Sequence, residues 1–415
     1  MPRRALAIGV APILAACGLL APLDGLTGGD AGADARGSED AGDAFQALAD
    51  ALPSETGAAD APSQTCEAGL TVCGGACVDL QSEASSCGRC GHDCGGGACD
   101  AGTCQPVTLA SGLDSPRALT VSGSTVYFTT HGSSGYVASC PTTGCGSNPT
   151  VLTKGLALGA GIAVSGTSIF FAAFGNSQGD GGYAGNGAFS CSTMGCAQAT
   201  PLASSPGNPV GITTDGAFVY WNDSSLGQIL SCAAGGCGGV PTVITSGQSS
   251  PWYGVAVDAS SAYVYWTGRG DGTVDRCDLP ACAKGALPIA TGRAGPFDLA
   301  VDATSVYFTS YDPNSPMNPA SGTVESCAVT GCSGGHVIFA GQQVTPVGIA
   351  VDDSAVYWAN NGDGTIASCP KSGCPSAGPM QLAASQSGPF LVALDTGFVY
   401  WTNTSGGTVM RVAKP

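Results

Sequence analysis

The sequence contains little charge for its length. Charged residues make up only 10% of its 415 residues, against about 25% in an average globular protein. Helical bundles and coiled coils need stripes rich in Ala, Glu, Lys and Arg, and such stripes are missing. With 13 basic and 30 acidic residues, the formal net charge is −17. This charge argues against a nucleic-acid partner, because phosphate binding requires Lys and Arg to displace counterions.

Cysteine and glycine are abundant instead. The chain has 21 cysteines, which point to an oxidising compartment. It also has 65 glycines and 26 prolines, residues that favour turns over long helices. We therefore expect an exported, turn-rich protein.

The first 17 residues have the pattern of an export signal. Two arginines at positions 3 and 4 precede the apolar stretch 5–16, which is too short to span a bilayer as a helix. The stretch ends in Leu14-Ala15-Ala16-Cys17, which resembles the lipobox of bacterial lipoproteins. The resemblance implies cleavage before Cys17 and lipid attachment to it. We expect a lipid anchor in the cell envelope, at the outer membrane or cell surface. The alternative is an ordinary secretory signal with a chance cysteine.

The number of cysteines agrees with this interpretation. Without Cys17, 20 cysteines remain, an even number that can pair completely. Residues 18–65 contain nine acidic residues and one base, Arg36. They bury too little apolar surface to offset the entropy of ordering, so we expect an acidic, disordered tether.

Residues 66–104 form a separate cysteine-rich segment. Its eight cysteines lie at positions 66, 73, 77, 87, 90, 94, 99 and 104. The runs Cys73-Gly-Gly-Ala-Cys77 and Cys87-Gly-Arg-Cys90-Gly-His-Asp-Cys94 resemble a small module of bacterial surface lipoproteins. So short a segment cannot build an ordinary hydrophobic core, so we expect four disulfides to hold it independently. Their connectivity stays open among 105 possibilities. A zinc site at Cys87, Cys90 and His92 is the alternative, although export favours oxidation of the thiols.

One pattern recurs seven times over residues 105–415. Its clearest element starts at Val126-Tyr-Phe, Ile169-Phe-Phe, Val219-Tyr-Trp, Val264-Tyr-Trp, Val306-Tyr-Phe, Val356-Tyr-Trp and Val399-Tyr-Trp. The steps between these elements are 43, 50, 45, 42, 50 and 43 residues. This period predicts an all-β fold, a seven-bladed β-propeller with four strands, a to d, in each blade. Six blades are the alternative.

The ends of the repeat array predict how the ring closes. The last repeat stops after its third strand, Gly407–Val412, whereas Pro106–Gly112 resembles a fourth strand that precedes the first repeat. Pairing these two segments leaves neither edge exposed. The aspartates that follow the first strand, such as Asp352, are expected to build the a–b turns by accepting backbone amides.

Six of the repeats contain a Cys-x4-Cys motif. The spacing predicts a local disulfide across each c–d hairpin, because its arms bring α-carbons within bonding range. The pairs are Cys140 and Cys145, Cys191 and Cys196, Cys232 and Cys237, Cys277 and Cys282, Cys327 and Cys332, and Cys369 and Cys374. We expect no metal at these positions.

The Val-Tyr-Trp-Thr element resembles the YWTD and NHL-type propeller repeats. The resemblance is loose, because Gly268 follows Trp266-Thr267 and Asn403 follows Trp401-Thr402, where the YWTD motif has aspartate. It implies the type of fold and no site residues. The tripeptide Arg269-Gly-Asp aligns with the b–c turn Asn361-Gly-Asp of another repeat, and we interpret it as a turn.

Candidate binding residues lie on the b–c connections. Two of these are long, 172–187 and 310–322, and long loops on a rigid scaffold usually carry function. Neutral insertion is the alternative. The candidates are His131, Phe174, Asp180, Tyr183, Tyr311 and Asp312. A lone histidine offers no catalytic set, and no nucleophile elbow or phosphate loop is present, so we expect no catalytic residues and no cofactor.

These observations predict a monomeric envelope lipoprotein whose propeller binds a protein or a glycan. It contacts the membrane only through its lipid. Two alternatives remain, an exported propeller enzyme of lyase or lactonase type and a purely structural envelope component.

Overall fold

The computed structural model describes residues 65–415 except 133–134, 157, 175–185, 205–206, 314–320 and 333–335. They belong to one compact unit, Gln64–Pro415. The predicted signal peptide and residues 18–64 of the predicted tether lie outside the described residues. Within the described part of the chain, no helix is long and apolar enough to cross a membrane.

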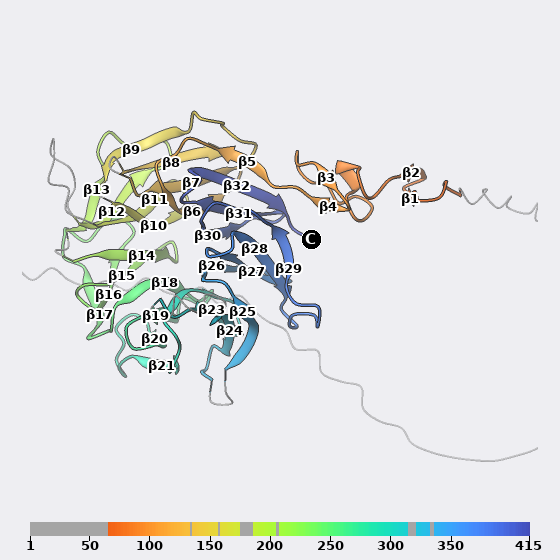
Figure 1. The fold of residues 1–415 in the computed structure, drawn as a ribbon. Helices are drawn as coiled ribbons and strands as arrows, with labels where there is room; N and C mark the ends of the chain where they lie inside the picture. The colour runs from red at the N-terminus through yellow and green to blue at the C-terminus, as the bar shows by residue number, and fades with distance from the viewer. Residues whose placement is uncertain are drawn as a thin grey trace, which may run out of the picture. The chain divides into compact units, whose positions relative to one another are not determined.

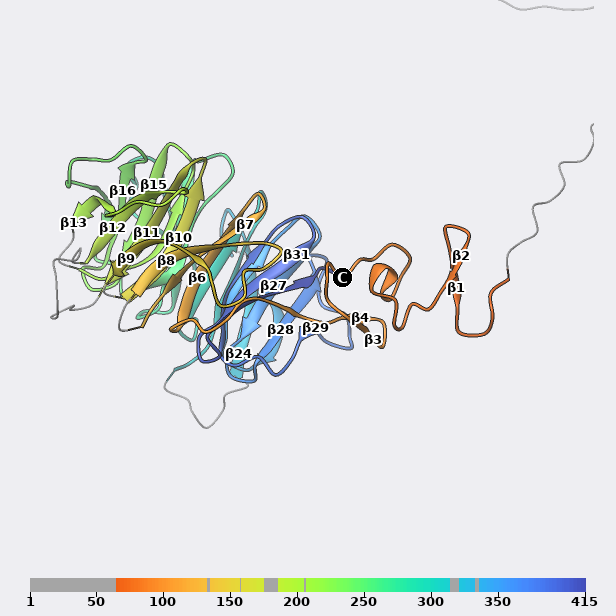
Figure 2. The same ribbon diagram turned by 90° about the horizontal axis from the view of Figure 1, so that it is seen from above.

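Seven four-stranded antiparallel sheets form a β-propeller, whose blades follow one another around a common axis (Figures 1 and 2). The prediction of seven blades is confirmed, and the alternative of six is wrong. Strands a, b, c and d run in this order from the inside of each blade to its outer edge. The a–b and c–d connections share one face of the ring, which we call the a–b face. The b–c and d–a connections share the other, which we call the b–c face.

The strands fall into four groups according to their place in the blade. The a strands are β6 (Pro116–Ser122), β10 (Leu158–Ser165), β14 (Pro209–Thr214), β18 (Pro251–Val257), β22 (Pro296–Val301), β26 (Pro346–Val351) and β30 (Pro389–Leu394). The b strands are β7 (Thr125–Thr130), β11 (Ser168–Phe174), β15 (Phe218–Asp223), β19 (Tyr263–Gly268), β23 (Ser305–Ser310), β27 (Ala355–Asn360) and β31 (Phe398–Asn403). The c strands are β8 (Gly135–Pro141), β12 (Gly187–Ser192), β16 (Gln228–Ala233), β20 (Thr273–Asp278), β24 (Gly322–Ala328), β28 (Thr365–Pro370) and β32 (Thr408–Ala413). The d strands are β9 (Thr150–Leu156), β13 (Thr200–Ser204), β17 (Thr242–Ser246), β21 (Leu287–Ala290), β25 (Val337–Gln343), β29 (Met380–Ala383) and, in blade 7, β5 (Val107–Ala110).

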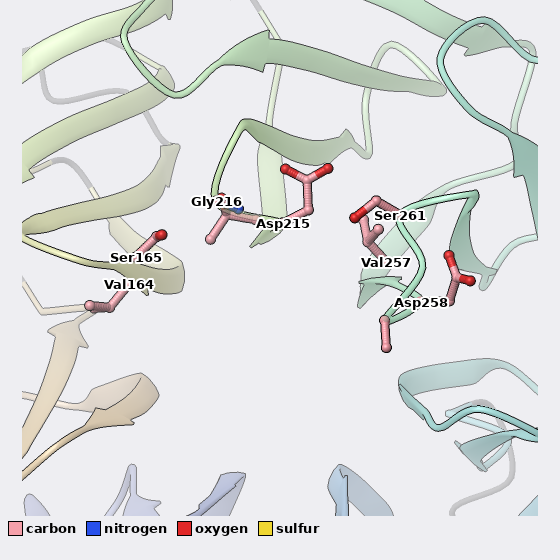
Figure 3. Close-up of a pocket in the computed structure, with 9 residues that line it drawn as sticks. Val164, Ser165, Asp215, Gly216, Val257, Asp258 and Ser261 are labelled. Carbon is pink, nitrogen blue, oxygen red and sulfur yellow. The ribbon is translucent and has the colours of Figure 1, made fainter. Parts of the chain in front are cut away.

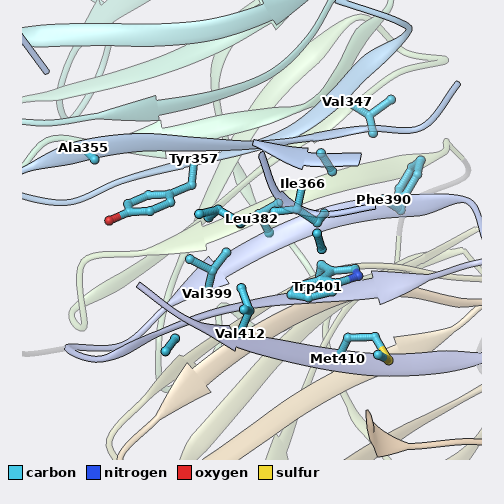
Figure 4. Close-up of a cluster of buried hydrophobic side chains, with 14 of the residues drawn as sticks. Val347, Ala355, Tyr357, Ile366, Leu382, Phe390, Val399, Trp401, Met410 and Val412 are labelled. Atoms are coloured by element: carbon cyan, nitrogen blue, oxygen red, sulfur yellow. The ribbon is translucent and has the colours of Figure 1, made fainter. Parts of the chain in front are cut away.

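The Val-Tyr-Trp element forms the b strand because this strand is covered on both sides. Successive side chains of a strand point to opposite faces of the sheet. Because each blade packs between two neighbours, both faces are covered, and the b strand can be apolar at every position. Trp221, Trp266, Trp358 and Trp401 are all fully buried. Figure 4 shows part of this core, where Trp401 lies among apolar side chains of the last two blades.

The ring closes as predicted. Strand β5 pairs with β32, so the first strand of the propeller completes the last blade. Leu109 and Ala110 of β5 are fully buried. A second contact crosses the same junction, because the Thr402 hydroxyl donates to the carbonyl of Arg117 at 2.7 Å.

This threonine contact is one of several that join neighbouring blades. At the matching position of other b strands, the hydroxyl groups of Thr129 and Thr309 donate to carbonyls of the next a strand, at 2.7 and 2.6 Å. Some tryptophans of the b strands contact the preceding blade instead of the next one. The indole of Trp358 donates to Gln343 of the preceding blade at 2.9 Å, as does that of Trp401 to Gln386 at 3.1 Å. These buried polar groups are thus satisfied by partners in the neighbouring blade.

The a–b turns contain the expected aspartates. One carboxylate oxygen of Asp352 accepts the amides of Ser354 and Ala355, both at 2.8 Å. Asp395 accepts the amides of Gly397 and Phe398 in the same way. The structure also pairs each of the six Cys-x4-Cys motifs in a disulfide, with Cα–Cα distances of 4.9 to 5.7 Å.

The cysteine-rich segment contains two short hairpins and one helical turn. These are β1 (Thr71–Cys73) with β2 (Ala76–Val78), β3 (Cys99–Asp100) with β4 (Thr103–Cys104), and the 3₁₀ turn η1 (Ala84–Ser86). Four disulfides hold it, joining residues 66 to 77, 73 to 90, 87 to 99 and 94 to 104. The structure thereby selects one of the connectivities that the sequence left open.

The segment is not free of the propeller. The Arg411 guanidinium donates to the carbonyl of Gly95, and His92 donates from Nε2 to the carbonyl of Lys414 at 2.7 Å. Gly95 also lies against Phe398, where an added Cβ would meet the ring at 2.2 Å. The expectation that its disulfides hold the segment independently therefore omits a packed contact with blade 7.

Candidate binding site on the b–c face

The second residue of the a strands builds the centre of the b–c face. In blades 1, 5 and 7 it is Arg117, Phe297 and Phe390, and a one-residue insertion in blade 4 puts Tyr253 at the same register. The ring centroids of Tyr253 and Phe297 lie 5.4 Å apart, and those of Tyr253 and Phe390 lie 5.2 Å apart. Because blades 4 and 7 are not neighbours, these rings meet across the propeller axis. They close the centre of this face with an aromatic cluster.

Arg117 extends the cluster with a positive charge. Its Nε donates to the Tyr253 hydroxyl at 2.9 Å, and its guanidinium carbon lies 4.3 Å from the centroid of Phe390. Burial raises the pKa of Tyr253, so this hydroxyl stays neutral and can accept the hydrogen bond. Cation–π contacts with aromatic faces stabilise the guanidinium without an acidic partner.

A second arginine lies between blades 4 and 5. The guanidinium carbon of Arg269 is 5.3 Å from the ring centroid of Trp252, 5.2 Å from Phe297 and 5.1 Å from Tyr311. Its Nη2 also donates to the Tyr311 hydroxyl at 3.1 Å. The backbone of Arg269-Gly-Asp forms the predicted turn, in which the amide of Gly272 donates to the carbonyl of Gly268 at 3.0 Å.

A pocket opens beside this arginine. Its volume is about 620 Å³, within the range of small-molecule sites. Trp252, Arg269, Asp271, Arg293, Asp312 and Pro313 contribute to its walls. The pocket combines an aromatic surface, two arginines and two carboxylates, which can recognise a ligand that carries both apolar faces and polar groups.

The structure brings four of the six predicted site residues to this face. The rings of His131 and Phe174 contact each other edge to face, with centroids 5.6 Å apart. The Tyr311 hydroxyl accepts a hydrogen bond from Arg269, and Asp312 lines the pocket. The ring centroid of Tyr311 lies 5.8 Å from that of Phe297, and Phe174 packs against the larger hydrophobic cluster to which the central rings belong. Asp180 and Tyr183 lie outside the described residues.

His131 has a defined environment. The carbonyl of Gly159 lies 3.0 Å from its Nδ1, so that nitrogen donates and carries the proton. Burial lowers the pKa of His131, and the positive charge of Arg117 lowers it further. The imidazole is therefore neutral at physiological pH, with its lone pair on Nε2.

The sequence interpretation missed the arginines and most of the aromatic cluster. It gave no role to the residues at the start of the a strands, and it interpreted Arg269 as part of a turn. The signal was a departure from the repeat, because Val210 and Val347 occupy the position that holds Phe297 in blade 5. An aromatic or charged residue at a position where other repeats have a small apolar one indicates a site.

One residue after Phe297, strand β22 has an acidic side chain, Asp298. Four other blades have glycine at its position, for example Gly211 and Gly348. Its carboxylate accepts the amides of Leu299 at 2.9 Å and Ile349 at 3.1 Å. Burial nevertheless raises its pKa to about 7.

The a–b face has a smaller pocket of about 310 Å³ at the turns of blades 2 to 4 (Figure 3). Asp215 and Asp258 line it. Both carboxylates already accept backbone amides of their own turns, which is the role predicted for them.

Among the residues that the structure describes, one group of cysteines lies close enough to hold a metal. The sulfur atoms of Cys87, Cys94 and Cys104 lie within 4.8 Å of one another. All three belong to disulfides, and so does Cys90 of the zinc alternative. A disulfide sulfur is not a thiolate ligand, so oxidation excludes the zinc alternative at these cysteines.

Comparisons with known proteins give different results for the cysteine-rich segment and for the propeller. Residues 49–106 match the model of the stigma-specific STIG1-like protein family. This stretch includes all eight cysteines of the disulfide-rich segment. No curated protein matches the chain.

The propeller resembles solved structures of low sequence identity. A catalytically inactive virginiamycin B lyase from Staphylococcus aureus with quinupristin is 13% identical, covering 75% of this chain and 99% of that one, with a TM-score of 0.56. A streptogramin B lyase is 15% identical, covering 74% and 96%, with a TM-score of 0.56. The WD40 β-propeller domain of Doa1 is 12% identical, covering 75% and 97%, also with a TM-score of 0.56. At these identities the likeness shows the fold alone.

Proposed function

We propose that this protein is an exported binding protein, and that the b–c face of its propeller binds a protein or a glycan. The observation that carries the proposal is the arginine–aromatic surface around Trp252, Arg269 and Tyr311. Aromatic residues and arginine are the side chains that dominate binding energy at interfaces. The ten disulfides agree with an extracytoplasmic location.

We further propose that the protein is anchored by a lipid on Cys17 and that the acidic segment after it acts as a spacer. The lipobox-like residues Leu14–Cys17 support this anchor. Metabolic labelling with a fatty acid tests it. Cys17→Ser should abolish labelling and release the protein from membranes, and normal labelling of the variant would contradict the anchor.

The binding proposal is tested by screening residues 18–415 on a glycan array and against extracellular protein fractions. A ligand of the b–c face should lose at least tenfold in affinity when Trp252 is changed to alanine. Phe218, an exposed aromatic at the a–b turn of blade 3, is the matched control. If Phe218→Ala weakens binding as much as Trp252→Ala, the binding surface has been assigned to the wrong face.

An exported enzyme is the second candidate function. The observation that favours it is His131, a neutral histidine with its lone pair on Nε2, on the same face as the pocket. Such a group can act as a general base. Turnover of a panel of lactones and cyclic peptides that disappears in His131→Ala would support this candidate. Turnover that survives the substitution would contradict it.

A further inference from the structure

Arg269 has no acidic partner among the described residues, whereas four other cations of the propeller pair with a carboxylate. Arg293 contacts Glu325 at 2.9 Å, and Lys371 contacts Asp302 at 2.6 Å. The guanidinium of Arg269 is instead held by three aromatic rings and one hydroxyl. In a chain with a net charge of −17, a cation that is fixed and unneutralised on a pocket wall is exceptional.

The surroundings of this guanidinium prepare it for an anion. The rings fix its orientation before a ligand arrives, so little conformational entropy is lost on binding. They also displace water from the faces of the guanidinium, which strengthens a charge-assisted hydrogen bond to a carboxylate. A carboxylate matches the planar donors of arginine in a bidentate geometry.

The other walls of the pocket indicate what carries that carboxylate. Trp252 is partly exposed there and offers an aromatic surface of the kind on which a sugar ring packs. Asp271 and Asp312 are exposed carboxylates on the same walls. The Asp271 carboxylate can accept hydrogen bonds from the hydroxyl groups of a sugar.

We propose that the pocket binds an acidic saccharide, with Arg269 pairing to the carboxylate of a uronic acid and the ring packing against Trp252. This assignment rests on the proposed binding function of the b–c face and names the ligand class of that face. A volume of about 620 Å³ accommodates a short stretch of such a chain.

Tryptophan fluorescence gives a direct readout. The protein has five tryptophans, and four of them are fully buried in the b strands. Trp252 alone is partly exposed, so quenching by acrylamide reports on the pocket. The probe is tri-galacturonic acid added to residues 18–415, and the neutral trisaccharide of galactose is its matched ligand. Trp252→Phe should remove the quenchable signal and confirm its source.

The acidic trisaccharide should protect Trp252 from acrylamide and bind at least tenfold more tightly than the neutral one. Arg269→Gln should remove that preference. Arg269→Lys keeps the charge without the planar fork and should retain part of it. Lys284→Gln removes an equal charge from an exposed side chain on the a–b face of the same blade and should change nothing. Thermal melting of each variant separates lost binding from lost folding.

Three results overturn the proposal. Equal binding of the acidic and neutral trisaccharides rejects the role of Arg269 but leaves the b–c face as a binding surface. Protection of Trp252 by an acidic peptide and by neither saccharide rejects the glycan class. If no sugar, peptide or protein ligand protects Trp252, both this proposal and the binding function of the b–c face are wrong.

Discussion

The cysteine-rich segment and the propeller are stabilised by different means. The segment, residues 66–104, buries few side chains, chiefly Ser86, Cys87, Cys94 and Cys104, and relies on four disulfides. The propeller buries a continuous series of apolar side chains in every blade. It adds one local disulfide to each of six blades. The same kind of bond is therefore essential in one region and supplementary in the other.

This difference follows from size. A chain of about 40 residues cannot bury enough apolar surface to offset its conformational entropy, so covalent links must replace a core. Seven stacked blades bury both faces of each sheet, and their stability comes from packing between neighbours. Ring closure should therefore matter more to the propeller than any of its disulfides.

The largest effect is expected from opening the ring. A chain that begins at Leu113 lacks β5 and its buried Leu109, and it leaves the outer edge of β32 unpaired. We expect it to lose at least about 5 kcal/mol of unfolding free energy relative to a chain that begins at Gln105. Both chains lack the cysteine-rich segment, so the comparison isolates the closing strand. Denaturant unfolding of the two chains measures it, and equal midpoints would show that β5 does not close the ring.

An intermediate effect is expected from breaking disulfides in the two regions. Replacing Cys87 and Cys99 by serine removes a bond at the centre of the segment, and we expect a local loss of about 3 kcal/mol. Replacing Cys369 and Cys374 should cost at or below about 2 kcal/mol, because the closed loop is short and the hairpin is packed.

Limited proteolysis and thermal melting separate these outcomes. The first variant should be cut within residues 66–104 while the propeller melts as before. The second should resist the protease throughout. If the protease cleaves the second variant before the first, the propeller depends on its disulfides more than the segment does. The proposed difference between the two regions is then wrong.

The smallest effect concerns Asp298 in the propeller, whose raised pKa makes the protein less stable as the pH rises. Asp298 has a pKa raised to about 7 in the folded state and an ordinary value of 3.8 when unfolded. Folding therefore takes up a proton between these values, and this group makes the protein less stable as the pH rises from about 4 to 7. Between pH 5 and pH 8 the loss should be roughly 2 kcal/mol.

Asp298→Gly, which installs the residue of four other blades, should remove this pH dependence whatever it does to absolute stability. Melting temperatures of both proteins at pH 5 and pH 8 provide the measurement. Asp278→Gly on the a–b face, where the carboxylate contacts the exposed Lys284, is the control. A pH dependence that stays unchanged in Asp298→Gly would assign it to other groups.

Much of the fold could be predicted because it repeats. A pattern that recurs seven times specifies the strands, and the odd strand at each end specifies closure, as β5 and β32 confirm. The site was harder to predict, because its residues depart from the repeat one at a time. Arg117, Trp252 and Phe390 lie far apart in the sequence, and nothing local indicates that they share one end of the axis. His131, Phe174, Tyr311 and Asp312 were found because they follow strands or lie on long connections, where position alone suggests exposure.

By itself, the sequence determined the repeat, the turn aspartates and which cysteines of the propeller are neighbours, because each depends on contacts within about ten residues. The count of repeats favoured seven blades, and the structure excluded six. Only the tertiary structure decided the pairing of the eight cysteines of the segment and its contact with Phe398. It alone also placed Arg269 among three rings from two blades. Such contacts depend on how the sheets are arranged around the axis, and a side chain's partner across that axis is not encoded in its local sequence.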